Sequence, residues 1–149
     1  MKLIPRKTPA LALVLLGTPA LLAHADTFLA LKASSPLLVG ASGGFYFAGP
    51  DQDQTAPPAL RPMVEAELGV GGGKILGGMD ALGDGFGYGV KGGILRTWLE
   101  PVGADRDNTY LGFEIEGGYD RVILALGGYR RIEGEGDGWL GTVSIGFRL

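Results

Sequence analysis

Residues 139–149 read Trp-Leu-Gly-Thr-Val-Ser-Ile-Gly-Phe-Arg-Leu. One face of this segment carries Trp139, Gly141, Val143, Ile145, Phe147 and Leu149. The opposite face carries Thr142, Ser144, Gly146 and Arg148, and only Leu140 interrupts it. A β-strand directs alternate side chains to opposite faces, so the segment is predicted to be a strand with one apolar and one polar side.

The other end of the chain has the features of a secretion signal. Lys2, Arg6 and Lys7 supply a positive segment, and a short apolar stretch follows at residues 10–22. The stretch is too short for a helical membrane span, which takes roughly 20 apolar residues. Ala23 and Ala25 provide the small residues of a cleavage site, so we expect a signal peptide at 1–25 and a single mature domain at 26–149.

Composition excludes several classes of chemistry. The signal contains three of the 13 basic residues and none of the 16 acidic ones, so the mature chain has a net charge of about −6. This balance argues against nucleic acid as a partner. The mature chain also lacks cysteine and histidine, because the single histidine lies in the signal. Serine–histidine catalysis, thiol chemistry and the usual zinc sites are therefore not expected; we predict no enzyme and no cofactor.

Turn-forming residues divide the mature chain into short segments of the length that a tilted strand needs to cross a bilayer. A polar, proline-rich loop is expected at 49–59, a charged loop at 101–108 and a glycine-rich hairpin at 134–138. Glycine is abundant within the segments themselves, as in curved sheets. The candidate strands are 27–33, 37–48, 60–70, 74–82, 86–99, 109–118, 121–132 and 139–149.

Several of these segments alternate as residues 139–149 do. Leu111, Phe113 and Ile115 share one face, opposite Glu114 and Glu116. Residues 60–70 and 86–99 behave similarly, whereas 27–48 and 121–126 alternate poorly. Together with the signal, the pattern predicts an all-β, antiparallel up-and-down β-barrel of about eight strands that is transmembrane.

Aromatic residues lie near the strand ends, as in the two aromatic belts of membrane barrels. They are Phe45, Tyr46, Phe47, Phe86, Tyr88, Trp98, Tyr110, Tyr119, Tyr129, Trp139 and Phe147.

The lengths of the expected loops disagree with the prediction of a transmembrane barrel. With both termini periplasmic, the long 49–59 loop would face the periplasm and the short 71–73 turn would face outward, the reverse of the usual pattern. A misassigned strand within 27–48, unusual loops, or a barrel that does not span a membrane would each explain this.

Charged residues on the polar faces are predicted to point into the barrel. They are Glu65, Glu67, Lys74, Lys91, Glu114, Glu116 and Arg148. The interior of an eight-stranded barrel is filled by side chains, so these charges must be paired. A salt-bridged plug is the favoured interpretation, and a ligand or proton path is the alternative. Acidic groups at 105–108 and 133–137 are interpreted as solvated loop charge, with a weak divalent-cation contact as the alternative.

The signal, the glycine-rich alternating strands and the terminal W-x-G-x-V-x-I-x-F-x-L pattern resemble small bacterial outer-membrane β-barrel proteins of the eight-stranded type. The resemblance implies a Gram-negative outer membrane and contact with its lipid. It also implies that the barrel-assembly machinery reads the terminal strand through Val143, Ile145, Phe147 and Leu149. The chain departs from the pattern in ending with Leu149, where an aromatic residue is usual.

Two function hypotheses follow from these patterns. The first is a non-enzymatic outer-membrane barrel with a structural, surface-interaction or minor permeability role. The second is a soluble periplasmic or secreted barrel that binds a small apolar ligand in the manner of lipocalins, which the poorly alternating segments would suit. The two differ in whether the apolar faces point outward or inward. The ligand cannot be derived from the sequence under either hypothesis.

Overall fold

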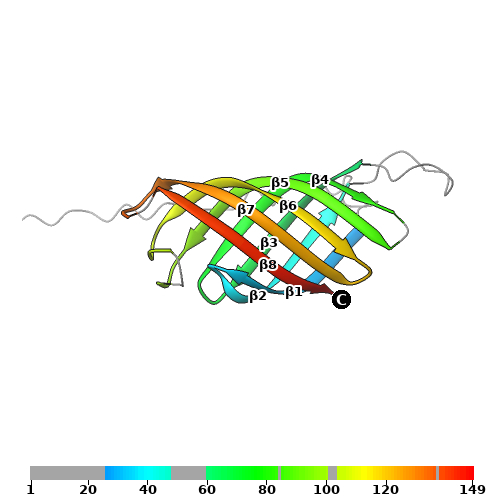
Figure 1. Ribbon diagram of the computed structural model, residues 1–149, viewed down its shortest axis with the longest axis horizontal. Helices are drawn as coiled ribbons and strands as arrows, with labels where there is room; N and C mark the ends of the chain where they lie inside the picture. Colours follow the sequence, from blue (N-terminus) through cyan, green and yellow to red (C-terminus); the bar gives the residue numbers. More distant parts are fainter. Residues whose placement is uncertain (1–25, 48–59, 84, 101–103, 137) are drawn as a thin grey trace, which may run out of the picture.

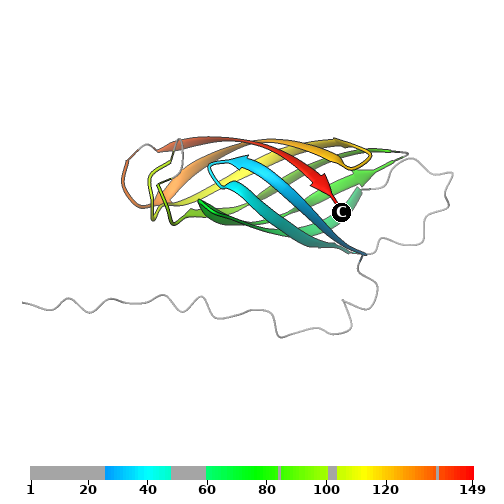
Figure 2. The ribbon, with the colours of Figure 1, turned by 90° about the horizontal axis from the view of Figure 1, so that it is seen from below.

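The computed structural model describes residues 26–47, 60–83, 85–100, 104–136 and 138–149. Eight antiparallel strands follow one another around a closed barrel, each hydrogen-bonded to its neighbours in the sequence (Figure 1). The last strand pairs with the first, so the barrel has no open edge (Figure 2). In the ranges described, no helix is long and apolar enough to cross a membrane. The predicted all-β, up-and-down barrel is confirmed.

The strands are 9–12 residues long. Their bounds are β1 Asp26–Ser35, β2 Leu38–Tyr46, β3 Leu60–Gly69, β4 Gly72–Leu82, β5 Phe86–Thr97, β6 Thr109–Tyr119, β7 Val122–Glu133 and β8 Trp139–Arg148. Closure is in register, with Leu31 opposite Phe147 and Ala33 opposite Ile145. The predicted strand order is therefore correct throughout, including both strands within 27–48.

Two strand boundaries differ from the prediction for physical reasons. Gly72 and Gly73 were expected in a turn, but they pair with Thr97 and Arg96 at the start of β4, because ladder hydrogen bonds need no side chain. Leu37 was expected to begin the second strand. It instead lies in the β1–β2 turn with its side chain fully buried inside the barrel. Burial of this leucine outweighs one more ladder pair.

The barrel has two distinct ends. The terminal end holds the start of β1, the end of β8 and the β4–β5 and β6–β7 turns; the loop end holds the β1–β2, β3–β4, β5–β6 and β7–β8 connections. The β3–β4 connection at the loop end is only Val70 and Gly71, so the disagreement over loop lengths does not come from a misassigned strand. The expected loop at 49–59 and the signal at 1–25, with Ala23 and Ala25, lie outside the described residues.

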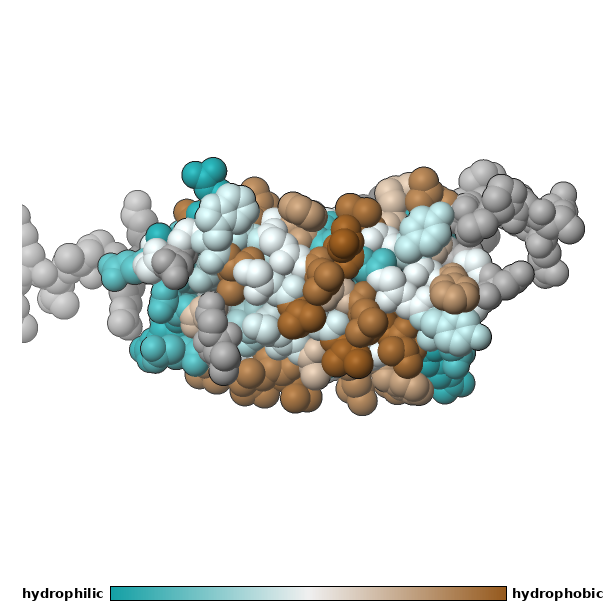
Figure 3. Space-filling model, viewed as in Figure 1, coloured by the Kyte–Doolittle hydropathy of each residue, from teal (hydrophilic) through white to brown (hydrophobic). Residues whose placement is uncertain are grey.

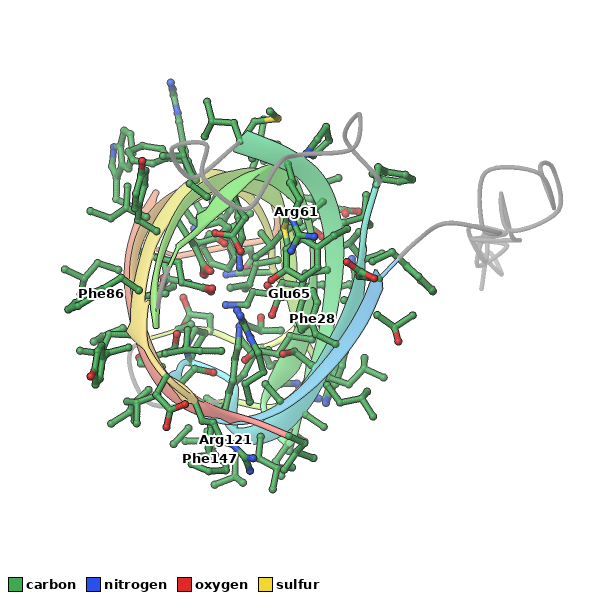
Figure 4. All side chains as sticks on the ribbon, turned by 90° about the vertical axis from the view of Figure 1, so that its right-hand side faces the viewer. Phe28, Arg61, Glu65, Phe86, Arg121 and Phe147 are labelled. Atoms are coloured by element: carbon green, nitrogen blue, oxygen red, sulfur yellow. The ribbon has the colours of Figure 1, made fainter. Side chains whose placement is uncertain are left out.

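Apolar side chains cover the outside of the barrel, and polar ones fill its lumen. Figure 3 shows hydrophobic residues gathered across the middle of the visible face, with hydrophilic residues chiefly toward the two ends. Phe113, Ile115 and Leu124 point outward and are 59%, 53% and 56% exposed. Figure 4, viewed from the terminal end, shows Phe86 and Phe147 outside the ring of strands and Glu65 inside it. The alternation in the sequence thus separates an apolar exterior from a charged interior.

Glycines on the lumen side allow the strands to coil tightly and leave room for long side chains. A Cβ at Gly112 of β6 would overlap the backbone of Gly128 and Tyr129 on the neighbouring strand. A Cβ at Gly146 would lie 2.8 Å from Cγ of Lys32. By contrast, a Cβ at Gly117 on the outer face of β6 would meet nothing within 4 Å. The high glycine content therefore has a steric cause on the inner surface.

Replacing Gly112 with alanine should destabilise the barrel by about 1–3 kcal/mol, because the added methyl group forces neighbouring backbone apart. The matched control is Gly117→Ala in the same strand, where the added methyl group has open space. Denaturant unfolding of both variants in the same detergent measures the difference. Equal stability of the two variants would contradict the steric role assigned to Gly112.

Candidate functional site

The lumen brings together all seven charged residues that the sequence assigned to the interior. Six of them are buried, namely Glu65, Glu67, Lys74, Lys91, Glu114 and Glu116. Arg148 is partly buried near the terminal end, with its side chain 24% exposed. They come from β3, β4, β5, β6 and β8, and lie on one inner surface because each occupies the inward phase of its strand.

These residues form a continuous sequence of alternating charges when Lys32 of β1 is included. We call this set the ion-pair chain; each member lies within 4.0 Å of the next. In order it runs Glu114, Lys74, Glu67, Lys32, Glu65, Lys91, Glu116, Arg148. Four carboxylates and four cations therefore compensate one another across six strands.

The central pairs of the ion-pair chain have close hydrogen-bonding geometry. Nζ of Lys91 lies 2.7 Å from Oε2 of Glu65 and 2.6 Å from Oε2 of Glu116. Lys32 donates to the other oxygen of Glu65. Because all four side chains are at least nine-tenths buried, their charges are shielded from solvent and depend on one another.

Hydroxyl groups add hydrogen bonds to two of the glutamates, and Oε2 of Glu67 accepts none from the described residues. Lys74 donates to both oxygens of Glu114, at 2.8 and 3.0 Å. The Tyr129 hydroxyl donates to Oε1 of Glu114 at 2.9 Å, and the Ser34 hydroxyl donates to Glu67 at 2.8 Å. Such additional donors stabilise carboxylates that cannot reach water. The arrangement suits a rigid structural core.

Lys32 is the main member that sequence reasoning missed. Residues 27–48 alternate poorly because the apolar Phe28 and Ala30 share the inward face of β1 with Lys32. The inward face of this strand therefore does not look polar in the sequence. The sequence did contain an indication of the position of Lys32. Leu29 and Leu31 are apolar and point outward, so the alternation of the strand places Lys32 on the inner side. The same applies to Asp80, which shares the phase of the correctly assigned Lys74 in β4.

Three tyrosines that were counted toward the aromatic belts belong to the lumen instead. Tyr46, Tyr110 and Tyr129 are 4%, 2% and 0% exposed. Their hydroxyl groups find partners inside: the Tyr46 hydroxyl donates to Asp80 at 3.0 Å, and that of Tyr110 accepts from Asn108 at 3.2 Å. The outward aromatics near the terminal end are Phe45, Phe86, Tyr88, Tyr119 and Phe147, and those near the loop end are Trp98 and Trp139.

An apolar layer closes the lumen toward the loop end. It consists of Leu37, Leu76, Leu95, Tyr110, Tyr129 and Leu140, with Ala104 of the β5–β6 connection packed against it. Asn108 ties this connection to the β7–β8 connection: its side-chain amide donates to the Glu135 carbonyl at 2.8 Å and accepts from the Glu135 amide at 3.1 Å. The described part of the loop end is therefore a fixed surface over a filled lumen.

Of the acidic groups at 105–108 and 133–137, Asp105, Asp107 and Glu135 line a shallow depression at this surface. Within the described residues, no group of three or more His, Cys, Asp or Glu side chains is placed to hold a metal ion. Asp137 lies outside those residues. The terminal-strand residues Val143, Ile145, Phe147 and Leu149 all point outward, between 46% and 69% exposed.

Comparisons with protein-family models, curated proteins and solved structures find no match to this chain.

Replacing Lys91 with methionine should destabilise the barrel by about 3–5 kcal/mol, because it leaves Glu65 and Glu116 buried without a full complement of positive charge. Arg106→Met is the control, since that side chain is 70% exposed on a loop and should matter little. Thermal or denaturant unfolding measures both. A Lys91→Met protein as stable as the control would show that the ion-pair chain does not stabilise the fold.

Proposed function

We propose that this protein is a closed, non-enzymatic β-barrel of the bacterial outer membrane, with a structural or surface-interaction role. The observation that carries the proposal is the inversion of polarity: the exterior is apolar and the interior is charged. Soluble proteins rarely expose apolar patches of more than a few hundred Å². A continuous apolar exterior is the arrangement that lipid favours.

The dimensions of the barrel support the same setting. Strands of 9–12 residues match the roughly 9–11 tilted residues that span a hydrocarbon core. Closure leaves no backbone edge, which lipid requires because it offers no hydrogen bonds. Outward aromatics near both ends suit the two membrane interfaces.

The filled lumen favours a structural or surface role over permeation. The ion-pair chain crosses its middle, and the apolar layer closes it toward the loop end. For the same reason the lipocalin-like alternative has less support, since an apolar ligand would need the space that paired charges occupy. The surface role would fall to the β5–β6 and β7–β8 connections, which Asn108 holds together. In this setting the outward residues of β8 would meet the barrel-assembly machinery.

The direct test is fractionation of the expressed protein, followed by gel migration with and without boiling. We expect the protein in the outer-membrane fraction and a faster-migrating unboiled form, because a closed barrel resists detergent unfolding. Recovery in the soluble periplasmic fraction would contradict the proposal and favour the lipocalin-like alternative.

Charge substitutions on the outer face separate the two settings independently. Ile115→Arg in the middle of β6, beside Val90 and Leu126, should destabilise the lipid-embedded barrel by about 2–4 kcal/mol. Ile132→Arg, equally exposed but near the loop end, is the control and should cost about 0–1 kcal/mol. Unfolding in lipid vesicles measures this depth dependence. Equal tolerance of both substitutions is the outcome expected of a soluble barrel.

A further inference from the structure

A partly enclosed cavity of about 250 Å³ opens at the terminal end of the lumen, between β4, β5, β6, β7 and β8. Its polar lining includes Asp80, Glu116, Asp120 and Arg148. Ile123 contributes an inward apolar side chain, whereas the Phe86 side chain points away from the lumen. The cavity therefore combines acidic groups with one inward apolar side chain.

Asp80 differs from every other buried carboxylate that the structure describes. It is 1% exposed, yet no lysine or arginine nitrogen of the described residues lies within 4.0 Å of it. Its Oδ2 accepts a hydrogen bond from the Tyr46 hydroxyl at 3.0 Å. Its Oδ1 lies over Gly89, whose missing side chain leaves room for it, and receives no hydrogen bond from any described residue. One oxygen of a buried carboxylate is thus left without a donor.

The nearby cations are already engaged. Lys91 and Arg148 belong to the ion-pair chain, in which four cations balance four glutamates. Arg61, at the mouth of the barrel, is held by Asp26 at 2.9 Å. Asp80 is therefore a buried acid with no ion-pair partner among the described residues. Burial of an uncompensated charge is strongly unfavourable, so a positive group in the cavity would stabilise the site.

We propose that the cavity binds a small organic cation through a primary ammonium group, with Asp80 as the residue that holds it. An ammonium group supplies the missing charge and donates the hydrogen bonds that Oδ1 lacks. A short alkyl chain on the ammonium group contacts Ile123, which a bare metal ion would not use. The described acidic residues also provide no metal-binding group. The site does not depend on whether the barrel resides in a membrane.

The test is calorimetric titration of the purified full-length chain, folded in detergent, with 1,4-diaminobutane. We expect saturable binding that weakens at least tenfold in Asp80→Asn and is unchanged in Asp107→Asn, an exposed acid at the loop end. The neutral analogue 1,4-butanediol should not bind. Circular dichroism and gel migration show whether each variant keeps its barrel.

Four outcomes would overturn the proposal. The first is no saturable binding by the unmodified chain, and the second is equal binding by a folded Asp80→Asn variant. The third is binding of Na⁺ or Mg²⁺ through Asp80 without binding of the diamine, which would make the site inorganic. Equal binding of the diamine and the diol would also contradict it, because the charge would then play no part.

Discussion

The narrow lumen forces the charged side chains of this barrel to compensate one another. Glu65 illustrates the constraint, because it is fully buried and contacts Lys32 on one oxygen and Lys91 on the other. Water could not compensate the charge of Glu65 if either lysine were missing. The alternation of four glutamates with four cations therefore fixes how β1, β3, β4, β5, β6 and β8 lie around the axis. Sliding one of these strands by one residue would turn its charge into the apolar exterior.

Glycine is the steric counterpart of these long side chains. Where a charged or aromatic side chain crosses the lumen, the facing position often has no side chain. Gly146 faces Lys32, Gly127 faces Glu114, and Gly44 faces Phe28. A larger residue at these positions would displace the group that the ion pairs hold in place. Glycine content and buried charge are thus two aspects of one packing solution in a small barrel.

The sequence was sufficient for the fold but only partly for the lumen. Strand order and polarity followed from alternation, because an inside–outside division has the same period as the strand itself. Lys32 and Asp80 were missed because their inward neighbours, Phe28 and Leu76, are apolar and blur the pattern. The apolar layer was not predictable from periodicity, since Leu37 belongs to a turn and reaches the lumen only through the closed topology.

The same limit applies to the tyrosines. Position near a strand end does not say which face a side chain occupies, and Tyr46, Tyr110 and Tyr129 differ from Tyr88 and Tyr119 only in phase. The inward three take hydroxyl partners from the lumen, whereas the outward two remain on the surface. The face of the strand that an aromatic residue occupies, rather than its distance from the strand end, therefore decides whether it lies on the outer surface or in the core.

The two ends of the lumen differ in a way that alternation alone does not require. Toward the loop end, an apolar layer and the Asn108 tie cover the ion-pair chain. Toward the terminal end, the chain finishes at Arg148, which lies over the ring of Phe28 and lines the cavity beside Asp80. The cavity among the described residues thus lies on the side of the termini, and the apolar layer lies on the other. A ligand of the proposed ammonium site would therefore enter from the side of the termini, opposite the apolar layer.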